Sequence, residues 1–121
     1  LAHGQLARKP NLRMNLIRIE NQMSIIYHRS IIRALLFPSP QSTEDLLTLR
    51  DLFQSYTYYS NYNFRLAIIN ILLAAYFADR LEQLRVAKAF AYEAREILNN
   101  TTRTGMIPNK LMLQLNHILA D

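Results

Sequence analysis

Residues 41–104 of this chain contain neither glycine nor proline, so more than half of the sequence carries no strong helix breaker. Glycine occurs only at positions 4 and 105, and proline only at positions 10, 38, 40 and 108. Because these two residues disfavour helices most strongly, long segments without them suit helices joined by a few turns. Valine occurs once, which limits the β-branched enrichment typical of strands. We therefore predict an all-α fold with about five helices, in a compact bundle or a short helical array.

The composition is that of one globular domain spanning residues 1–121. Half of the residues are hydrophobic and 19% are charged, which excludes intrinsic disorder. The first residue is leucine, so we interpret the chain as a piece of a longer protein or a processed product. No run of 18 apolar residues occurs, and we expect no membrane span. The absence of cysteine excludes disulfides and favours a reducing intracellular compartment such as the cytoplasm.

The first predicted helix follows an irregular lead-in at residues 1–10 and ends at Phe37, before Pro38. Its apolar residues recur at steps of four and three on one face: Leu12, Leu16, Ile19, Met23 and Ile26. Its second half is apolar around much of its circumference, and we expect it to pack on more than one side. The residues concerned are Ile25, Ile26, Ile31, Ile32, Leu35 and Leu36.

Four further helices are predicted beyond a turn at residues 39–43. Ser42 and Asp45 form a variant capping box for the second helix, which carries Leu46, Leu49, Phe53 and Tyr56 on one face. The third helix, 64–78, is almost entirely apolar and should lie at the centre. The fourth, 82–98, carries small alanines that permit close approach to a neighbour, and the fifth begins near Pro108.

The third and fourth helices together resemble a tetratricopeptide-type hairpin. Ile69, Leu72 and Tyr76 stand at its large-residue positions, whereas Ala87 and Ala94 stand at its small-residue positions. Residues 64–119, with the turn at 105–108, also resemble the helical activation domain of some bacterial transcription regulators, which is built from similar hairpins. The resemblance implies a surface that binds a peptide or a partner protein, and it implies no catalytic residue.

The sequence carries no catalytic, cofactor-binding or metal-binding motif. His3, His28 and His117 are far apart and outside any ligand-spaced pattern. Two glycines cannot build a phosphate-cradling loop. Glu93 and Glu96 are three residues apart, but we interpret them as part of a solvated helix face. We therefore predict that the protein is not an enzyme and that it uses neither a cofactor nor a metal.

The net charge of +5 belongs to the first quarter of the chain. Residues 1–33 hold six basic side chains against Glu20 alone, and the remaining residues are balanced. Arg18, Arg29 and Arg33 share one face of the first helix. Arginine suits phosphate and carboxylate partners, so this face is a candidate binding surface. The alternatives are a plain solvated face, or internal clamps to acidic residues of the second helix.

The second candidate surface is a cluster of tyrosines between the second and third helices: Tyr56, Tyr58, Tyr59 and Tyr62. Tyrosine offers a large amphipathic contact area and is enriched at interfaces. The alternative is that some of these rings complete the core.

These observations favour a non-catalytic protein-interaction module, acting as an adaptor or regulatory domain. Its candidate partner-binding residues are Arg18, Arg29, Arg33, Tyr58, Tyr59 and Tyr62. The alternative is a nucleic-acid-binding domain that uses the basic first helix, residues 8–33. We expect the partner to be another protein or a peptide in the first case.

Overall fold

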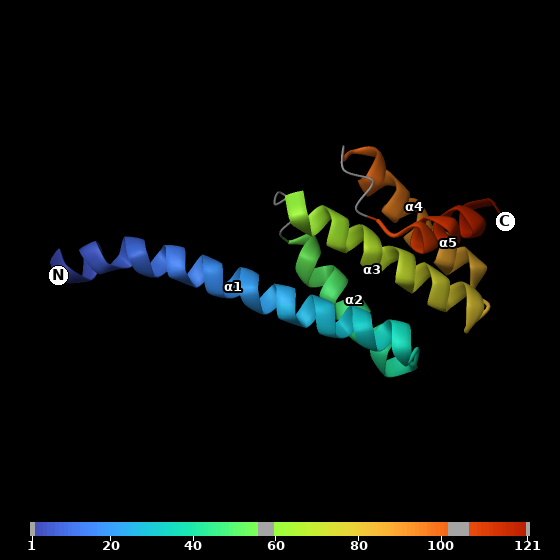
Figure 1. Cartoon of the computed structure of the whole chain (residues 1–121), viewed down its shortest axis with the longest axis horizontal. Coiled ribbons are helices and arrows are strands. Elements are labelled where there is room, and N and C mark those ends of the chain that lie inside the picture. Colours follow the sequence, from blue (N-terminus) through green and yellow to red (C-terminus); the bar gives the residue numbers. More distant parts are fainter. Residues whose placement is uncertain (1, 56–59, 102–106, 121) are drawn as a thin grey trace.

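A computed structural model of the protein describes residues 2–55, 60–101 and 107–120, and the side chains of residues 14, 17–55, 63–101 and 107–120 within them. These residues form five α-helices and no strand (Figure 1), which confirms the all-α prediction. None of the described helices is both long and apolar enough to cross a membrane. The helices are α1 (Ala2–Leu36), α2 (Pro40–Gln54), α3 (Ser60–Asp79), α4 (Leu84–Asn99) and α5 (Asn109–Ala120).

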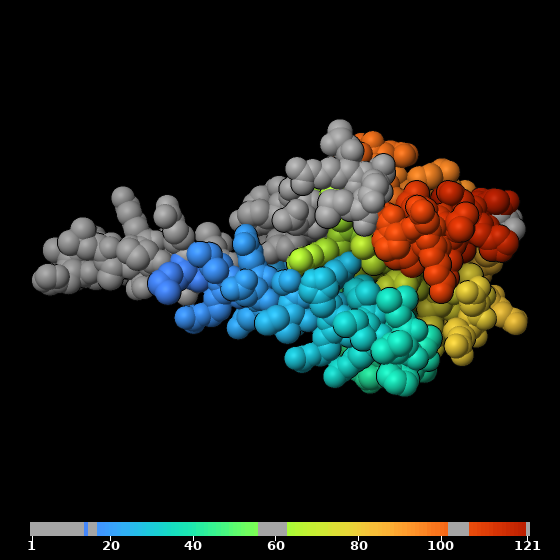
Figure 2. Space-filling model, in the orientation of Figure 1, coloured from blue at the N-terminus to red at the C-terminus, as the bar shows by residue number. Residues whose placement is uncertain are grey.

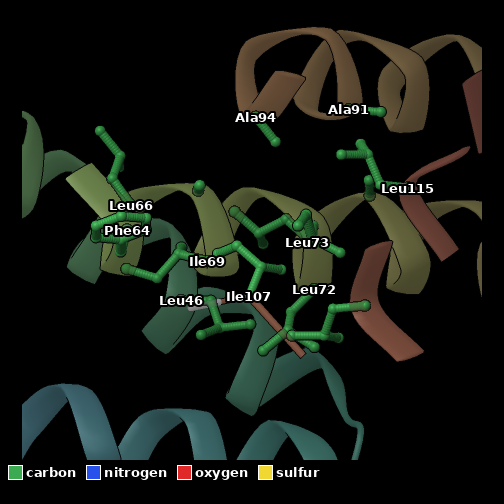
Figure 3. Close-up of a cluster of buried hydrophobic side chains, with 14 of the residues drawn as sticks. Leu46, Phe64, Leu66, Ile69, Leu72, Leu73, Ala91, Ala94, Ile107 and Leu115 are labelled. Carbon is green, nitrogen blue, oxygen red and sulfur yellow. The ribbon is translucent and has the colours of Figure 1, made fainter. Parts of the chain in front are cut away.

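Helix α3 is the structural centre, as its apolar sequence predicts. It contacts each of the other four helices. Its residues 69–74 are all buried, and Ile69 and Leu73 are completely inaccessible to solvent. The surrounding core comes from every side, with Leu46 from α2, Leu115 from α5 and the alanines of α4 (Figure 3). The central position of α3 therefore follows from its hydrophobic circumference, because every face has apolar surface to bury.

Helices α3 and α4 form the most extensive helix pair in the fold. The buried stripe of α4 consists of Ala87, Ala91, Ala94 and Leu98, at steps of four, three and four. Ala91 and Ala94 project from α4 beside α3 (Figure 3). Their small side chains let the two helix backbones approach closely, which confirms the predicted role of the alanines.

Helix α4 begins at Leu84, two residues later than predicted. Glu82 has a positive φ of 53°, which is incompatible with a right-handed helix. The turn before α4 is closed by backbone hydrogen bonds from Leu81 N–H to Tyr76 C=O and from Gln83 N–H to Phe77 C=O. These bonds satisfy carbonyl groups at the end of α3. Because residues 81 and 83 are held in this turn, α4 cannot begin before Leu84.

Helix α2 begins earlier than predicted, and its cap is a different serine. Ser39 is the N-cap: its hydroxyl accepts a hydrogen bond from Ser42 N–H, and the Ser42 hydroxyl accepts one from Ser39 N–H. The predicted cap, Ser42, is thus the third residue of the helix. Pro40 explains the shift, because its fixed φ and missing N–H suit the first position of a helix.

Helix α3 also begins earlier than predicted, at Ser60 instead of Phe64. Phe64 is buried in the core and Asn63 is half-buried, so tertiary packing stabilises a turn that the polar sequence of residues 60–63 does not favour by itself.

Helix α1 differs most from the prediction. It is helical from Ala2, so residues 2–10 are not an irregular lead-in. Residues 5–9 all have high helix propensity, and Pro10 removes one hydrogen bond without ending the helix. The N-terminal part of α1 extends well beyond the other helices (Figure 1). Its C-terminal half packs mainly on α2 and, to a smaller extent, on α3, and most of its circumference stays exposed.

Candidate interaction surface on helix α1

Helix α1 is attached to the bundle through one face, at the centre of which lies Tyr27. The Tyr27 ring is 5% exposed and stacks on Phe53 of α2, with the ring centroids 5.7 Å apart. The Arg65 guanidinium of α3 lies 5.0 Å from the centre of the Tyr27 ring and also donates a hydrogen bond to the Ser24 hydroxyl. Burial raises the pKa of the Tyr27 phenol to about 12, although Arg65 acts in the opposite direction. This face therefore fixes α1 on α2 and α3.

The rest of the α1 circumference carries an unusual amount of apolar surface. Nine of the fifteen exposed large apolar side chains among the described residues lie on α1 or directly follow it. They are Met14, Ile17, Ile19, Ile25, Ile26, Ile32, Leu35, Leu36 and Phe37. Single exposed apolar residues are common on proteins, but a concentration on one element is typical of a binding surface. In Figure 2 the corresponding part of α1 runs across the near face of the molecule with no other helix over it.

This exposure corrects the prediction for the second half of the first helix. Met23 and Tyr27 are buried, and Ile31 and Ala34 are half-buried, so the packed face runs through these positions. Five of the six residues expected to be packed all round are exposed, namely Ile25, Ile26, Ile32, Leu35 and Leu36. The physical reason is that α2 and α3 both approach α1 from the same side.

The three predicted arginines lie together on the exposed side of α1. Arg18, Arg29 and Arg33 are all exposed, and their spacing places them within about 60° of one another around the helix axis. Across the part of the chain that the structure describes, no carboxylate lies within ion-pairing distance of their guanidinium groups. The alternative in which these arginines clamp α1 to acidic residues of α2 is therefore wrong. Their positive charge is directed to solvent.

The tyrosine cluster falls mostly outside the described residues. This applies to Tyr56, Tyr58 and Tyr59, and for Tyr62 the structure describes only the backbone, within α3. The structure therefore leaves Arg18, Arg29 and Arg33 exposed on one face of α1 but gives no position for the tyrosine side chains of the predicted site.

A polar cluster between α2, α3 and α4 was not predicted from the sequence. The Arg50 Nε donates to Asn70 Oδ1 over 2.9 Å, and an Arg50 terminal nitrogen forms an ion pair with Glu93. The other Glu93 oxygen accepts from Gln54 Nε2 over 2.9 Å. Glu93 is thus a half-buried ion-pair partner, so the interpretation as a solvated face is wrong for Glu93, whereas Glu96 is exposed. The signal in the sequence was Asn70, because a polar residue inside an apolar helix requires a partner.

This cluster connects three helices and does not form a reactive site. Asn70 is completely buried, and its Nδ2 has no hydrogen-bond partner among the described residues. The Arg50 guanidinium also lies 5.4 Å from the centre of the Phe90 ring. Every charged group of the cluster is thus engaged with another side chain of the bundle. The arrangement fixes how α2, α3 and α4 pack.

A cavity of about 250 Å³ opens where the end of α1 meets α2, α3 and α5. Its lining includes Leu35, Pro38, Leu72, Tyr76 and Lys110. The cavity is small, and its lining combines these apolar side chains with three charged residues: Asp79, Arg80 and Lys110. Leu35 connects it with the exposed surface of α1, so the cavity lies at one end of the candidate interaction surface. No group of three potential metal ligands occurs among the described residues.

Comparison of the chain with protein families, curated proteins and solved structures yields no match.

Proposed function

We propose that this protein is a non-catalytic interaction module, an adaptor or regulatory domain that binds another protein through the exposed side of α1. The observation that carries the proposal is the concentration of large exposed apolar side chains on this one helix. Leaving so much apolar surface in water has a free-energy cost of roughly 25 cal/mol per Å², which a bound partner removes. The unpaired arginines on the same side add charge selectivity.

The tetratricopeptide-type resemblance of α3 and α4 stays a proposal about architecture, and it is supported by the alanine stripe of α4. In such hairpins the exposed inner face binds a peptide or a partner protein. Here residues 69–74 of α3 are buried, since α1, α2, α4 and α5 all contact this helix. The binding surface that remains available is therefore on α1, outside the hairpin.

Nucleic-acid binding is the alternative, and the unpaired exposed arginines favour it. Phosphate contacts with Arg18, Arg29 and Arg33 would give an affinity that falls steeply with salt concentration. Isoleucine and leucine side chains, however, contribute little to phosphate binding. Neighbouring apolar residues such as Ile25 and Ile32, which are 58% and 53% exposed, are better explained by a protein partner.

The test is affinity capture from the cells that produce the protein, with and without nuclease. Three forms are compared: the unchanged chain, the Ile25→Asp/Ile32→Asp double variant, and the Leu113→Asp variant. Leu113 is the matched control because it is 69% exposed but lies on α5. We expect the double variant to lose the captured proteins and the control to keep them, with no effect of nuclease. Captured proteins that are unaffected by the double substitution would contradict the proposal, and loss on nuclease treatment would favour the alternative.

A further inference from the structure

Seven residues on the exposed side of α1, spaced three or four positions apart, follow a heptad pattern. They are Met14, Arg18, Asn21, Ile25, His28, Ile32 and Leu35, at alternating steps of four and three. All seven are exposed, and the four apolar ones are between 53% and 60% exposed. We call these seven residues the heptad face. Alternating steps of this kind are the spacing at which one helix packs along another in a coiled coil.

The heptad face points away from the bundle. At about 100° per residue, its members lie on the side of α1 opposite Met23, Tyr27 and Ala34, which pack on the rest of the protein. From Met14 to Leu35 the face is roughly 30 Å long, at 1.5 Å per residue. This length is enough for about three heptads of a second helix. A partner helix can therefore lie along α1 without displacing α2 or α3.

Building on the proposed function, we infer that the heptad face binds an acidic amphipathic helix of a partner protein in a two-stranded coiled-coil arrangement. The apolar members, Met14, Ile25, Ile32 and Leu35, pack between the two helices. Arg18 lies within the contact, and Arg29 lies directly beside it at a flanking heptad position. Flanking positions are where charged pairs determine which helix is accepted.

Charge selects an acidic partner over a second copy of this chain. Helix α1 carries six basic residues, and Glu20 is its only acidic one. Two such helices side by side would bring like charges together, which opposes pairing. A helix with glutamates beside its apolar stripe would instead place carboxylates next to the guanidinium groups of Arg18 and Arg29. Those two groups have no acidic neighbour of their own within the described residues.

The polar residues of the heptad face favour a protein helix over a lipid surface as the binding partner. Arg18, Asn21 and His28 occupy three of the seven positions along this line, between apolar side chains at both of its ends. Insertion of this line into a bilayer would carry an arginine and an asparagine toward hydrocarbon, which is costly. In a coiled coil, polar residues at contact positions lower the stability of the pair but fix the register of the two helices. The same three residues would thus make pairing with a protein helix specific and would oppose insertion into a bilayer.

The test uses the full chain and three synthetic helical peptides of four heptads. The first has leucine and isoleucine at the contact positions and glutamate at the flanking positions. The second replaces the glutamates by lysines, and the third keeps the glutamates but has its apolar positions scrambled. Binding is measured by fluorescence anisotropy, and the helicity of each peptide is checked by circular dichroism.

We expect the acidic helix to bind at least 10-fold more tightly than either of the other peptides. The Ile25→Asp/Ile32→Asp variant should abolish this binding, and Arg18→Gln/Arg29→Gln should weaken it about 10-fold. Leu113→Asp, which changes an exposed residue of α5, should leave it unchanged. Equal binding of the acidic and basic peptides would overturn the inference, as would equal binding of the scrambled peptide.

Three further outcomes would also overturn it. The first is self-association of the chain, measured by sedimentation, that the Ile25→Asp/Ile32→Asp variant no longer shows. The second is tighter binding to anionic vesicles than to the acidic helix, and the third is tighter binding to duplex DNA than to the acidic helix. The failure of this inference is distinguishable from failure of the proposed function. If captured cellular proteins are lost in Ile25→Asp/Ile32→Asp but the acidic helix does not bind, the interaction surface stands and the partner chemistry is wrong.

Discussion

Close packing between α3 and α4 makes the α4 alanine stripe the sharpest place to test the fold. Ala87 is completely buried, and it lies outside the lining of the 250 Å³ cavity. Replacing it by leucine adds three carbon atoms at a point where the backbones of two helices already approach closely. The extra volume has no cavity to occupy, so the helices must separate or adopt strained rotamers. Overpacking of this kind costs roughly 1–3 kcal/mol of the free energy of unfolding.

The assay is thermal and urea unfolding followed by far-UV circular dichroism. For a chain of this size, the expected loss corresponds to a fall in Tm of roughly 4–12 °C. Ala89→Leu is the matched control, because Ala89 is exposed on the same helix only two residues away. Alanine and leucine both favour helices, so this control changes helix propensity little and should shift Tm by no more than about 2 °C. Equal effects of the two substitutions, or no effect of Ala87→Leu, would show that α4 packs through another face.

Three other measurements examine separate parts of the structure. Leu72→Ala in α3 should lower the free energy of unfolding by about 2–5 kcal/mol in urea unfolding, and a loss below about 1 kcal/mol would argue against its central position. Glu82→Gly should leave stability unchanged or raise it by up to about 1 kcal/mol, because Glu82 has a positive φ; Gln83→Gly, at a φ of −100°, should instead be destabilising. Because the pKa of Tyr27 is raised to about 12 from an ordinary 10.0, the unfolded state ionises first, so stability should fall between pH 10 and 12. In pH-dependent urea unfolding, Tyr27→Phe should make this fall smaller, and an identical fall in that variant would contradict the assignment.

The helices and much of the core could be predicted from the sequence. Apolar residues at steps of three and four, with few breakers between them, indicate helices whatever lies beside them. Helix α3 is apolar on every side, so its burial follows from its own composition. The buried alanines of α4 and the buried Leu46, Leu49 and Phe53 of α2 were predicted from their spacing of three or four residues along one helix face.

Helix boundaries could be predicted less well, because neighbouring residues compete to cap the same helix end. Ser39 and Ser42 are both suitable caps, and Pro40 decides between them by fitting the first helical position. The start of α4 is likewise set by hydrogen bonds, in this case to the last carbonyls of α3. The sequence does not show these bonds, because they depend on the conformation of the turn between α3 and α4.

Of the candidate site, the sequence by itself determined that Arg18, Arg29 and Arg33 share a face of a helix, since helical periodicity fixes which residues point in the same direction. Only the tertiary structure decided which faces of α1 are covered. Ile25, Ile32 and Leu35 are as apolar as the residues of α3, yet they remain exposed because α2 and α3 approach α1 from one side only. The partners of Glu93 were also decided at this level, since Arg50 and Gln54 reach it from another helix. Periodicity specifies directions around one helix axis, whereas burial depends on where the neighbouring helices lie.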